Sequence, residues 1–575
     1  LLSHSNTITL AAGAHTVTFR HQEGGGGDNW GLFVFTPTAV VTRNDYLVRV
    51  LSCPDSNAAY RETTCKGYPN GQYKPTGILH DFGETERMYF GLITGSQFNN
   101  LEGGVLRRNM ANFSSEIDSN TGIFDPDVLG IVNTINRLRM IGGGYAGGTV
   151  DNLNSNSNWN WANGTGNCVS QGYRALNNGE CRMWGNPLAE MVYESMRYFA
   201  GAATPTTRFS SGGGTQGVGE ETTMELEQET WKDPYASADD GGGGFLACSR
   251  PFQTLISDIN PSYDGDLPGS PFTGAITSTN GNPTSISSFN AATEGQTIWN
   301  DEFGAGSREV FIGDVANTTD AAPTAKTASS FGNIRGLSPE EPSKGGTYYT
   351  ASVSRFARNT DLNAVTGDQS LSTYAIALAS PLPRIRFPVG DGFISLLPFA
   401  KTSSGTFGTG PGPRRPTNTI VDFYVEEIVN LPGQAFDASV NGGLPYAVFR
   451  INYEDVEQGN DHDMDAIVRY YVVANADGTA TVTLNSEYAA GSANQIMGFV
   501  MSGSTQDGVY LDVRDTDSTL NPVPLYGLST PNPELPGACA NATPPAACTV
   551  MLPFNSTRTF TPAAAGTNSA SYLND

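Results

Sequence analysis

A short, largely apolar run at residues 252–258 ends in a carboxylate, Asp258. The run predicts a strand that is covered on both faces, as in a parallel sheet with helices on either side. Ligands of such sheets lie beyond the carboxyl ends of the strands, and further oxygen-bearing residues stand near this end: Ser257, Asn260, Asp264 and Asp266. Because Mg²⁺ and Ca²⁺ prefer oxygen ligands, Asp258 is a candidate ligand for either ion. A carboxylate that only caps the loop is the alternative.

A second group of carboxylates lies in a loop between two predicted strands, 446–453 and 466–471. The group consists of Asp455, Glu457, Asp461, Asp463 and Asp465. Acidic residues at alternate positions of a tight loop direct their oxygens at one cation, as calcium-binding loops do. The loop lacks the glycine and the distal glutamate of an EF-hand. We therefore expect a Ca²⁺ site of another kind in a β-domain, with a solvated acidic turn as the alternative.

Signals for catalysis are weak. The five histidines stand apart from one another, and the sequence contains no G-x-S-x-G, H-E-x-x-H or P-loop pattern. Carboxylates are abundant, but a pair for glycoside hydrolysis cannot be chosen without geometry. The acidic run 220–229 is interpreted as a solvated face, and Trp159 and Trp161 as either a sugar- or surface-binding platform or packing residues. We expect a protein that is not an enzyme.

The composition points to a secreted or surface protein. The 575 residues are too many for one ordinary core, so two or more domains are expected. The formal net charge of −25 argues against nucleic acid and anionic membranes as partners and favours cation binding. No apolar run reaches transmembrane length. The sequence begins inside a predicted strand. We therefore interpret the chain as an internal piece of a longer exported protein.

The seven cysteines form three local pairs and one remainder. None of the pairs has the C-x-x-C spacing of a zinc site, and each lies in loop-like sequence. The predicted disulfides are Cys53–Cys65, Cys168–Cys181 and Cys539–Cys548, with Cys248 left over. Disulfides of this kind indicate an oxidising compartment.

Hydrophobic periodicity divides the chain into three parts. Residues 1–40 show alternating strand patterns that resemble the closing strands of a β-sandwich of the PA14 or lectin type. Residues 41–383 alternate strands with helices, among them a helix over 188–199 and strands over 252–258 and 373–379, with a low-complexity insertion over 270–305. From residue 384 to 575 the period changes to two, which predicts an all-β module. The fold class expected is α/β plus all-β.

Three sets of motifs, spread over about residues 41–575, together carry a resemblance to a known family. The first set comprises residues 46–50, Cys53, 73–77, 87–92 and 103–107. The second comprises residues 185–190, 198–201, 248–258 and 267–269. The third comprises residues 373–383, 420–425 and 449–459, with the acidic run that follows. Together they resemble the PilC/PilY family of type IV pilus tip adhesins.

The resemblance implies a von Willebrand factor A-like domain, a doubly wound α/β fold with a metal-ion-dependent adhesion site at the carboxyl edge of its sheet. Asp258 then corresponds to the third acidic element of that site, and Asn186 stands where the family pattern has a threonine ligand. The Asp-x-Ser-x-Ser element is absent and would have to precede Leu1. The C-terminal β-propeller of the family is not visible either.

The function implied is that of an adhesin and assembly factor at the pilus tip. Such a protein binds minor pilins on one side and a host receptor or abiotic surface on the other, in a metal-dependent way. It would be exported through the periplasm of a Gram-negative bacterium to the cell surface, without membrane insertion. The alternative is a secreted lectin-like or glycan-active protein in which the A-domain is a scaffold.

Overall fold

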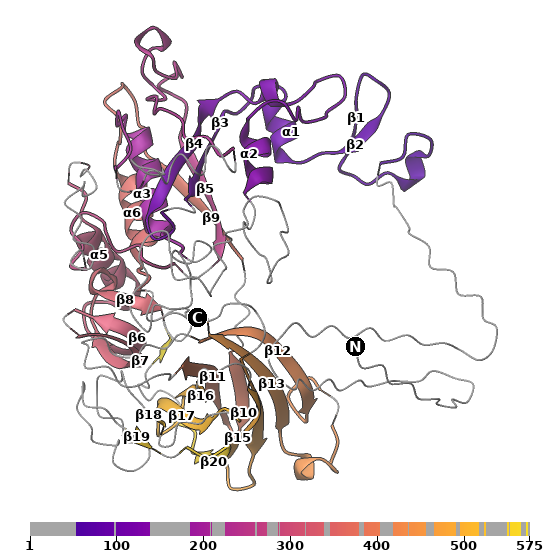
Figure 1. Cartoon of the computed structure of the whole chain (residues 1–575), viewed down its shortest axis with the longest axis vertical. Helices are drawn as coiled ribbons and strands as arrows, with labels where there is room; N and C mark the ends of the chain where they lie inside the picture. The colour runs from indigo at the N-terminus through magenta and orange to yellow at the C-terminus, as the bar shows by residue number, and fades with distance from the viewer. Residues whose placement is uncertain are drawn as a thin grey trace, which may run out of the picture. The chain divides into compact units, whose positions relative to one another are not determined.

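The computed structural model of the chain is shown in Figure 1. It describes residues 53–96, 99–138, 185–207, 209, 225–258, 261–272, 286, 288–316, 318–337, 345–378, 384–402, 418–434, 436–455, 465–489, 495–516, 523–524, 549–550, 552–564 and 571–572. The predicted strands of residues 1–40, the residues Trp159 and Trp161, and the cysteine pairs 168/181 and 539/548 lie outside these ranges.

The first part of the described chain is a mixture of short helices and strands. Its helices are α1 (Ile78–Gly83), α2 (Ile131–Arg137), α3 (Leu188–Phe199), α5 (Ala291–Phe303) and α6 (Tyr349–Asn359). Its strands are β1 (Cys65–Gly67), β2 (Tyr73–Pro75), β3 (Phe90–Gly95), β4 (Gly103–Ala111), β5 (Phe252–Asp258), β6 (Arg308–Val315), β7 (Thr318–Ala328), β8 (Ile334–Leu337) and β9 (Ser372–Leu378). In the described parts of the chain, no helix is both long and apolar enough to cross a membrane.

Helix α3 has the bounds that the sequence predicts. Pro187 stands at its N-cap, and Gly201, just past its end, adopts the left-handed conformation with φ of +76°. Glycine favours this position because it carries no Cβ to clash. The apolar residues of the helix are buried in one core cluster, including Val192, Tyr193 and Met196. The prediction that this stripe packs in the core is therefore confirmed.

Strands β5 and β9 run parallel and in register, with Phe252 opposite Ser372 and Asp258 opposite Leu378. Helices α3 and α6 lie together along one side of this pair (Figure 1). Leu255 of β5 packs against the core cluster that the two helices share. The other pairs in this part of the described chain differ from β5–β9 in direction. Strand β3 pairs antiparallel with β4, and β6 pairs antiparallel with both β7 and β8.

Helix α5 overturns part of the sequence analysis, which assigned residues 270–305 to a low-complexity insertion. The helix begins after Asn290, whose side chain accepts a hydrogen bond from the Thr293 backbone N–H at 2.9 Å. Trp299 is fully buried, its ring packs on Phe331, and its indole N–H donates to the Gly306 carbonyl at 2.9 Å. Tertiary packing on one tryptophan thus outweighs the poor helix propensity of the surrounding residues.

The second part of the described chain is a β-sandwich. One sheet has the order β10-β11-β16-β17 and the other the order β12-β13-β14-β15-β20. The bounds are β10 (Ile385–Val389), β11 (Gly392–Thr402), β12 (Asn418–Val429), β13 (Tyr446–Asp455), β14 (Ala466–Ala474), β15 (Ala480–Ala489), β16 (Gln495–Ser502), β17 (Gly508–Arg514) and β20 (Asn555–Phe560). Short strands complete the list: β18 (Val523–Pro524), β19 (Thr549–Val550) and β21 (Ser571–Tyr572), the last pairing with β6.

The core of the sandwich lies between the two sheets and follows the period of two. Burial alternates residue by residue along β14, whereas β16 is buried at every position. The Tyr470 hydroxyl donates to the carbonyl of Gly498, in the opposite sheet, at 2.6 Å. A Cβ at Gly498 would lie 1.6 Å from the Tyr510 carbonyl oxygen, so only glycine fits there. The predicted combination of an α/β region and a following β-rich region is confirmed.

Candidate functional site

Asn186 and Ser257 meet at the carboxyl end of the β5–β9 pair, where the sequence places its first candidate site. The Asn186 side-chain amide donates to the Ser257 hydroxyl at 2.9 Å. The Asn186 backbone N–H donates to the Ser262 hydroxyl at 2.7 Å, and the Ser262 N–H donates back to the Asn186 carbonyl at 2.8 Å. These three residues therefore join the entry of α3 to the end of β5 and the loop after it.

Gly185 makes this arrangement possible. Its φ is +116°, and a Cβ there would lie 2.0 Å from the Asn100 carbonyl oxygen. Any other residue at this position would clash with Asn100 and displace the backbone next to Asn186. Asp258 is the last residue of β5, next to Ser257, and its side chain lies outside the described part of the structure.

Asp264 is fully buried behind this edge and connects two helices. Its carboxylate accepts hydrogen bonds from the Ala189 backbone N–H, in the first turn of α3, at 3.2 Å and from the Thr347 N–H, just before α6, at 2.8 Å. Burial raises the pKa of Asp264 to about 7, and the hydrogen bonds oppose this shift. The residue fixes the starts of α3 and α6 relative to the loop after β5.

Glu190 is a buried carboxylate that the sequence analysis missed. One of its oxygens accepts a hydrogen bond from the Gly103 N–H at 3.1 Å, and the other, Oε1, is buried without a hydrogen-bond partner in the described structure. Burial raises the pKa of Glu190 well above its usual range, and the negative charges of Asp266 and Glu102 add to this effect. In the sequence, Glu190 looks like an ordinary acidic residue in the first turn of a helix.

The oxygen chemistry of this edge is the kind that Mg²⁺ and Ca²⁺ prefer. Within the residues that the structure describes, however, no group of three or more His, Cys, Asp or Glu side chains is arranged to hold a metal ion. The side-chain amide and the backbone N–H of Asn186 each donate to a serine hydroxyl. The side chain of Asp258, which the metal hypothesis needs, is not among the described ones.

The second candidate site lies at a hairpin of the β-sandwich. Asp455 ends β13 and Asp465 directly precedes β14, and these two strands pair antiparallel with Tyr453 opposite Ala466. Asp465 is buried, with 8% of its surface exposed. The predicted flanking strands are thus confirmed. Glu457, Asp461 and Asp463 lie outside the described residues.

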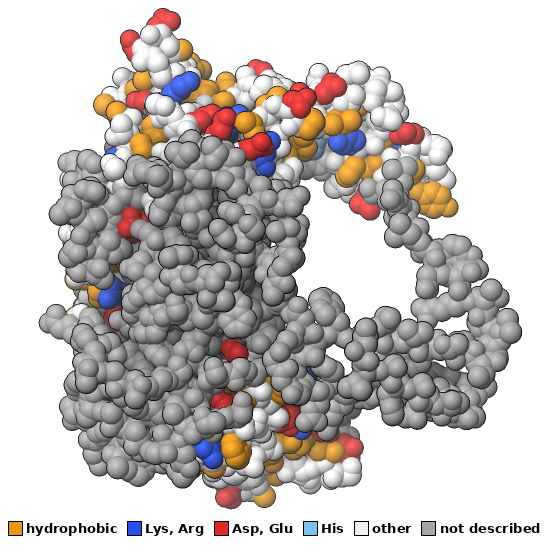
Figure 2. Space-filling model, viewed as in Figure 1, with side chains coloured by type: hydrophobic (Ala, Val, Ile, Leu, Met, Phe, Trp, Pro, Cys, Tyr) orange, Lys and Arg blue, Asp and Glu red, His pale blue; other side chains and the backbone are white. Residues whose placement is uncertain are grey.

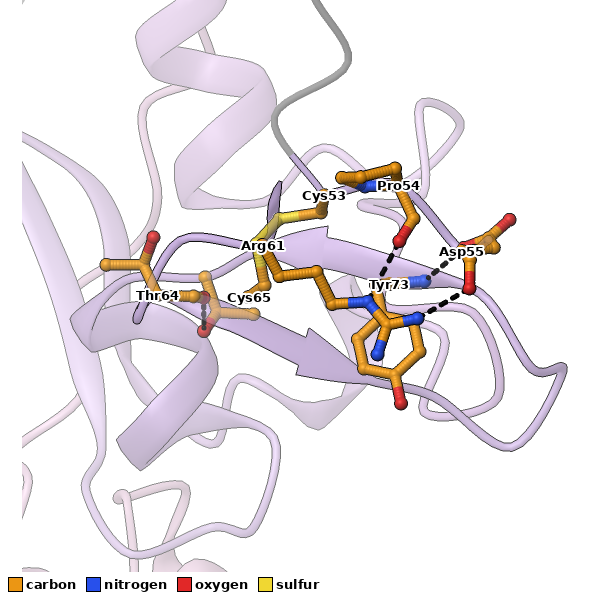
Figure 3. The surroundings of a disulfide bond; sticks show 8 residues. Cys53, Pro54, Asp55, Arg61, Thr64, Cys65 and Tyr73 are labelled. Atoms are coloured by element: carbon orange, nitrogen blue, oxygen red, sulfur yellow. Dashed lines mark hydrogen bonds between the residues drawn. A yellow bond between two sulfur atoms is a disulfide. The ribbon is translucent and has the colours of Figure 1, made fainter. Parts of the chain in front are cut away.

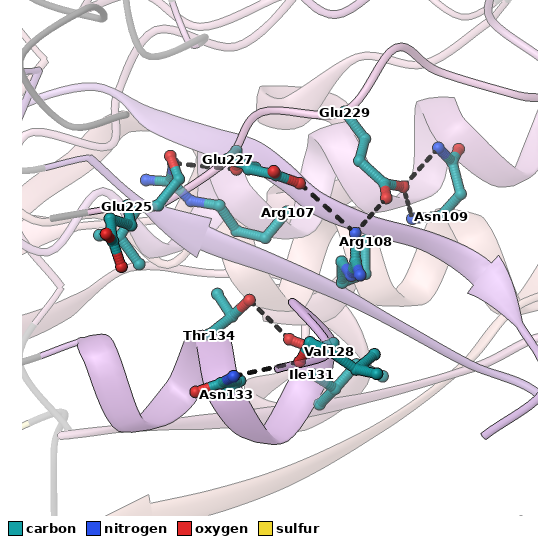
Figure 4. Close-up of polar contacts among 12 residues, drawn as sticks. Arg107, Arg108, Asn109, Val128, Ile131, Asn133, Thr134, Glu225, Glu227 and Glu229 are labelled. Atoms are coloured by element: carbon teal, nitrogen blue, oxygen red, sulfur yellow. Dashed lines mark hydrogen bonds and ion pairs between the residues drawn. The ribbon is translucent and has the colours of Figure 1, made fainter. Parts of the chain in front are cut away.

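The acidic run 220–229 is not simply the solvated face that the sequence suggested, because its end binds strand β4 (Figure 4). Glu229 accepts hydrogen bonds from the Arg108 guanidinium at 2.6 Å and from the backbone N–H of Asn109 at 2.6 Å. Glu227 lies 3.7 Å from Arg108 and is half exposed. A basic strand far away in sequence supplies the partners, which the local pattern could not reveal.

One of the three predicted disulfides falls in the described structure and is confirmed. Cys53 and Cys65 are bonded, with their Cα atoms 5.6 Å apart. Cys248 is a free, exposed cysteine, which agrees with the prediction that it has no local partner.

Comparison with known proteins finds matches to both parts of the chain, and for the second part it also names a β-sandwich. Family models match residues 90–357, as "PilY1 homolog, second domain", and residues 387–553, as "PilY1 homolog, beta-sandwich". The type IV pilus biogenesis factor PilY1 homolog of Xylella fastidiosa is 46% identical over 547 residues, which are 91% of this chain and 35% of the relative. No solved structure matches the chain.

The chain therefore belongs to the PilC/PilY family of type IV pilus factors, as its motifs indicated. It spans about a third of the length of the relative that it matches.

Proposed function

We propose that the chain belongs to a pilus-tip factor that promotes assembly of the type IV pilus and adheres to a host or abiotic surface. In this proposal it acts by binding rather than by catalysis, with minor pilins as its partners inside the pilus. The observation that carries the proposal is the 46% identity over 547 residues to a type IV pilus biogenesis factor. The net charge of −25 supports a partner other than nucleic acid or an anionic membrane.

We also propose that β5 and β9 belong to a larger, doubly wound sheet of the von Willebrand factor A type. Their face opposite α3 and α6 carries exposed apolar side chains: Phe252 at 46%, Ile256 at 65%, Tyr374 at 58% and Ile376 at 52%. Parallel sheets are normally covered on both faces, and a two-stranded sheet is marginally stable by itself. In this proposal, further strands and a second helical layer cover the exposed face.

Metal dependence forms the third part of the proposal. Asp258 and Asn186 would contribute to a Mg²⁺ or Ca²⁺ site at the carboxyl edge, and Asp455, Glu457, Asp461, Asp463 and Asp465 to a Ca²⁺ site in the sandwich. The support is the position of Asn186 beside Ser257 at the end of β5 and the hairpin that holds the two ends of the acidic loop together.

The experiment is genetic complementation with the full-length protein. A strain that lacks the gene is expected to show few surface pili and poor attachment to glass and host cells, and the unaltered gene to restore both. A strain that assembles pili and attaches normally without the gene would contradict the proposal. Restoration of attachment without pili would favour a secreted adhesin that acts independently of the pilus.

A further inference from the structure

The disulfide loop, residues 53–65, is held at its base by one covalent bond and by hydrogen bonds to the neighbouring strand. The Cys53–Cys65 bond closes it. At Cys65 the chain enters the β1–β2 hairpin, in which Cys65 lies opposite Pro75. The Thr76 backbone N–H also donates to the Thr64 carbonyl at 3.0 Å. The two ends of the loop are therefore fixed to the same small sheet.

Arg61 holds the middle of the loop from inside (Figure 3). Its guanidinium donates to the Pro54 carbonyl at 2.8 Å and to the Asp55 carbonyl at 2.5 Å, and it lies 3.4 Å from the centre of the Tyr73 ring. The Asp55 carboxylate in turn accepts a hydrogen bond from the Tyr73 backbone N–H at 2.9 Å. One arginine thus connects both arms of the loop to strand β2.

The outer end of the loop is a single helical turn, Ala58–Tyr60. Asn57 caps it by accepting a hydrogen bond from the Ala59 N–H at 3.1 Å. The turn contains no buried residue, and 74% of the Tyr60 surface is exposed. Hydrophobic side chains are visible at the surface over the end of the structure that carries β1 and β2 (Figure 2).

These restraints do not serve a hydrophobic core, because the loop tip buries none of its own side chains. Their effect is to fix the shape of the loop and the position of Tyr60. Tyrosine in a rigid loop is a typical anchor of protein interfaces, since it offers a large amphipathic surface and has little conformational freedom to lose. A loop that is already ordered also avoids the entropy of ordering upon binding.

We propose that the disulfide loop is a preorganised recognition loop that inserts Tyr60 into an apolar pocket of a pilus protein, a pocket rimmed by lysine and arginine. The proposal rests on the proposed function for the source of the partner. The charge of the rim follows from the loop, where Glu62 is exposed two residues after Tyr60 and the guanidinium of Arg61 is engaged by the carbonyls of the loop. A second copy of the chain is disfavoured as the partner, because both copies carry a net charge of −25.

The test measures binding of the whole 575-residue chain to each purified minor pilin of the same bacterium by biolayer interferometry, at low and at physiological salt. We expect at least one pilin to bind, and Tyr60→Ala to raise its Kd about tenfold or more, as removal of an interface anchor does. Phe436→Ala is the matched control, because Phe436 is an aromatic residue of the β-sandwich with 75% exposure. It should leave Kd within about twofold.

Two further variants separate the anchor from its support. Arg61→Ala leaves Tyr60 in place but removes the internal connection, so it should weaken binding about three- to tenfold and speed protease cleavage within the loop. Glu62→Gln, which leaves the Asp55–Tyr73 hydrogen bond intact, should mainly slow association and reduce its salt dependence. Circular dichroism and thermal melting should be unchanged in all variants, since the loop tip is outside the core.

Equal binding by the Tyr60→Ala and unaltered chains would overturn the inference and leave the proposed function standing. Binding of no minor pilin by the unaltered chain would contradict both the inference and the proposed pilin partnership, while the complementation experiment still decides the role in pilus assembly. An effect of Tyr60→Ala on retention by immobilised glycans alone would show that the partner class is wrong.

Discussion

The side-chain amide of Asn186 donates to the Ser257 hydroxyl at 2.9 Å, which connects the residue before helix α3 to the end of strand β5. Both groups are partly buried. We expect Asn186→Ala to lower the free energy of unfolding by about 0.5–1.5 kcal/mol, the usual net contribution of such a bond. Urea denaturation of the purified chain measures the change.

A double-mutant cycle supplies the control for this prediction. Ser257→Ala removes the partner, and the two changes together should cost less than the sum of the single changes, because both remove the same bond. Fully additive effects would show that the Asn186–Ser257 contact contributes nothing to stability. Ser262, which binds the Asn186 backbone, remains unaltered in all three variants.

The pH dependence of stability should reveal Asp264. Its pKa in the folded protein, about 7, is raised above the ordinary value of 3.8, so the folded state holds this proton more tightly than the unfolded state. Its contribution is fully present below pH 3.8 and is lost as the pH rises through about 7. Between these values the unfolding free energy should fall by up to about 1.4 kcal/mol per pH unit for this one proton.

Asp264→Asn is the variant that checks the assignment. Between about pH 4 and 7, the unfolding free energy of this variant should fall less steeply with pH, by the contribution of one proton. Denaturant titrations at several pH values measure this slope. Asp368 is a suitable control: it is exposed, and hydrogen bonds from Ser370 lower its pKa. The prediction would be contradicted if the plot of unfolding free energy against pH kept its slope in the Asp264→Asn variant but changed its slope in the Asp368→Asn variant.

Glu229 and Glu227, two residues apart in one segment, should contribute differently to the stability of the fold. Glu229 accepts three hydrogen bonds, from the Arg108 guanidinium and from both nitrogens of Asn109, at 2.6 to 2.7 Å. Glu229→Ala should lower the unfolding free energy by about 1–3 kcal/mol, because the Asn109 N–H would lose its partner. Glu227→Ala is the matched control, since an exposed carboxylate 3.7 Å from Arg108 contributes at most about 1 kcal/mol. Equal effects in thermal unfolding would contradict this difference.

The sequence predicted elements well where periodicity and end signals agree. Helix α3 has the expected bounds because Pro187, a regular apolar stripe and Gly201 all mark the same segment. Strand β5 also has the expected bounds, and Ser257 lies beside Asn186 as the position of the predicted edge required. The strands of the sandwich could be predicted from their period of two, which the alternating burial of residues along β14 reflects.

The elements that the sequence missed depend on contacts between distant residues. Helix α5 is fixed by Trp299 packing on Phe331, and residues 270–305 carry no strong helical pattern of their own. The buried position of Glu190 results from the packing of α3 against β4, where the Gly103 N–H meets its carboxylate. Neither contact leaves a local signal, so a single sequence cannot predict them.

The acidic loop between β13 and β14 should bind Ca²⁺ and require it for full stability. Five carboxylates (Asp455, Glu457, Asp461, Asp463 and Asp465) occur within this short segment, and Asp465 at its end is buried. At an effective dielectric constant near 20, two like charges ~4 Å apart repel by about 4 kcal/mol. A divalent cation reverses the sign of this energy, and a ligand that binds only the folded state stabilises it. Removal of Ca²⁺ with a chelator should therefore lower the melting temperature of the chain.

Two variants show whether this loop is the source of the calcium effect. Asp463→Ala should remove the part of the chelator sensitivity that this loop causes, because it removes a central ligand, and leave any part due to the proposed site at Asp258. Asp391→Ala, which alters an exposed acidic residue in the β10–β11 turn, should leave it intact. Isothermal titration of Ca²⁺ into the chelated protein should give a binding event that only the Asp463 variant loses. An unmoved melting curve and no calorimetric signal would show that the loop is an acidic turn, because a cation that neutralised these charges could not leave stability unchanged.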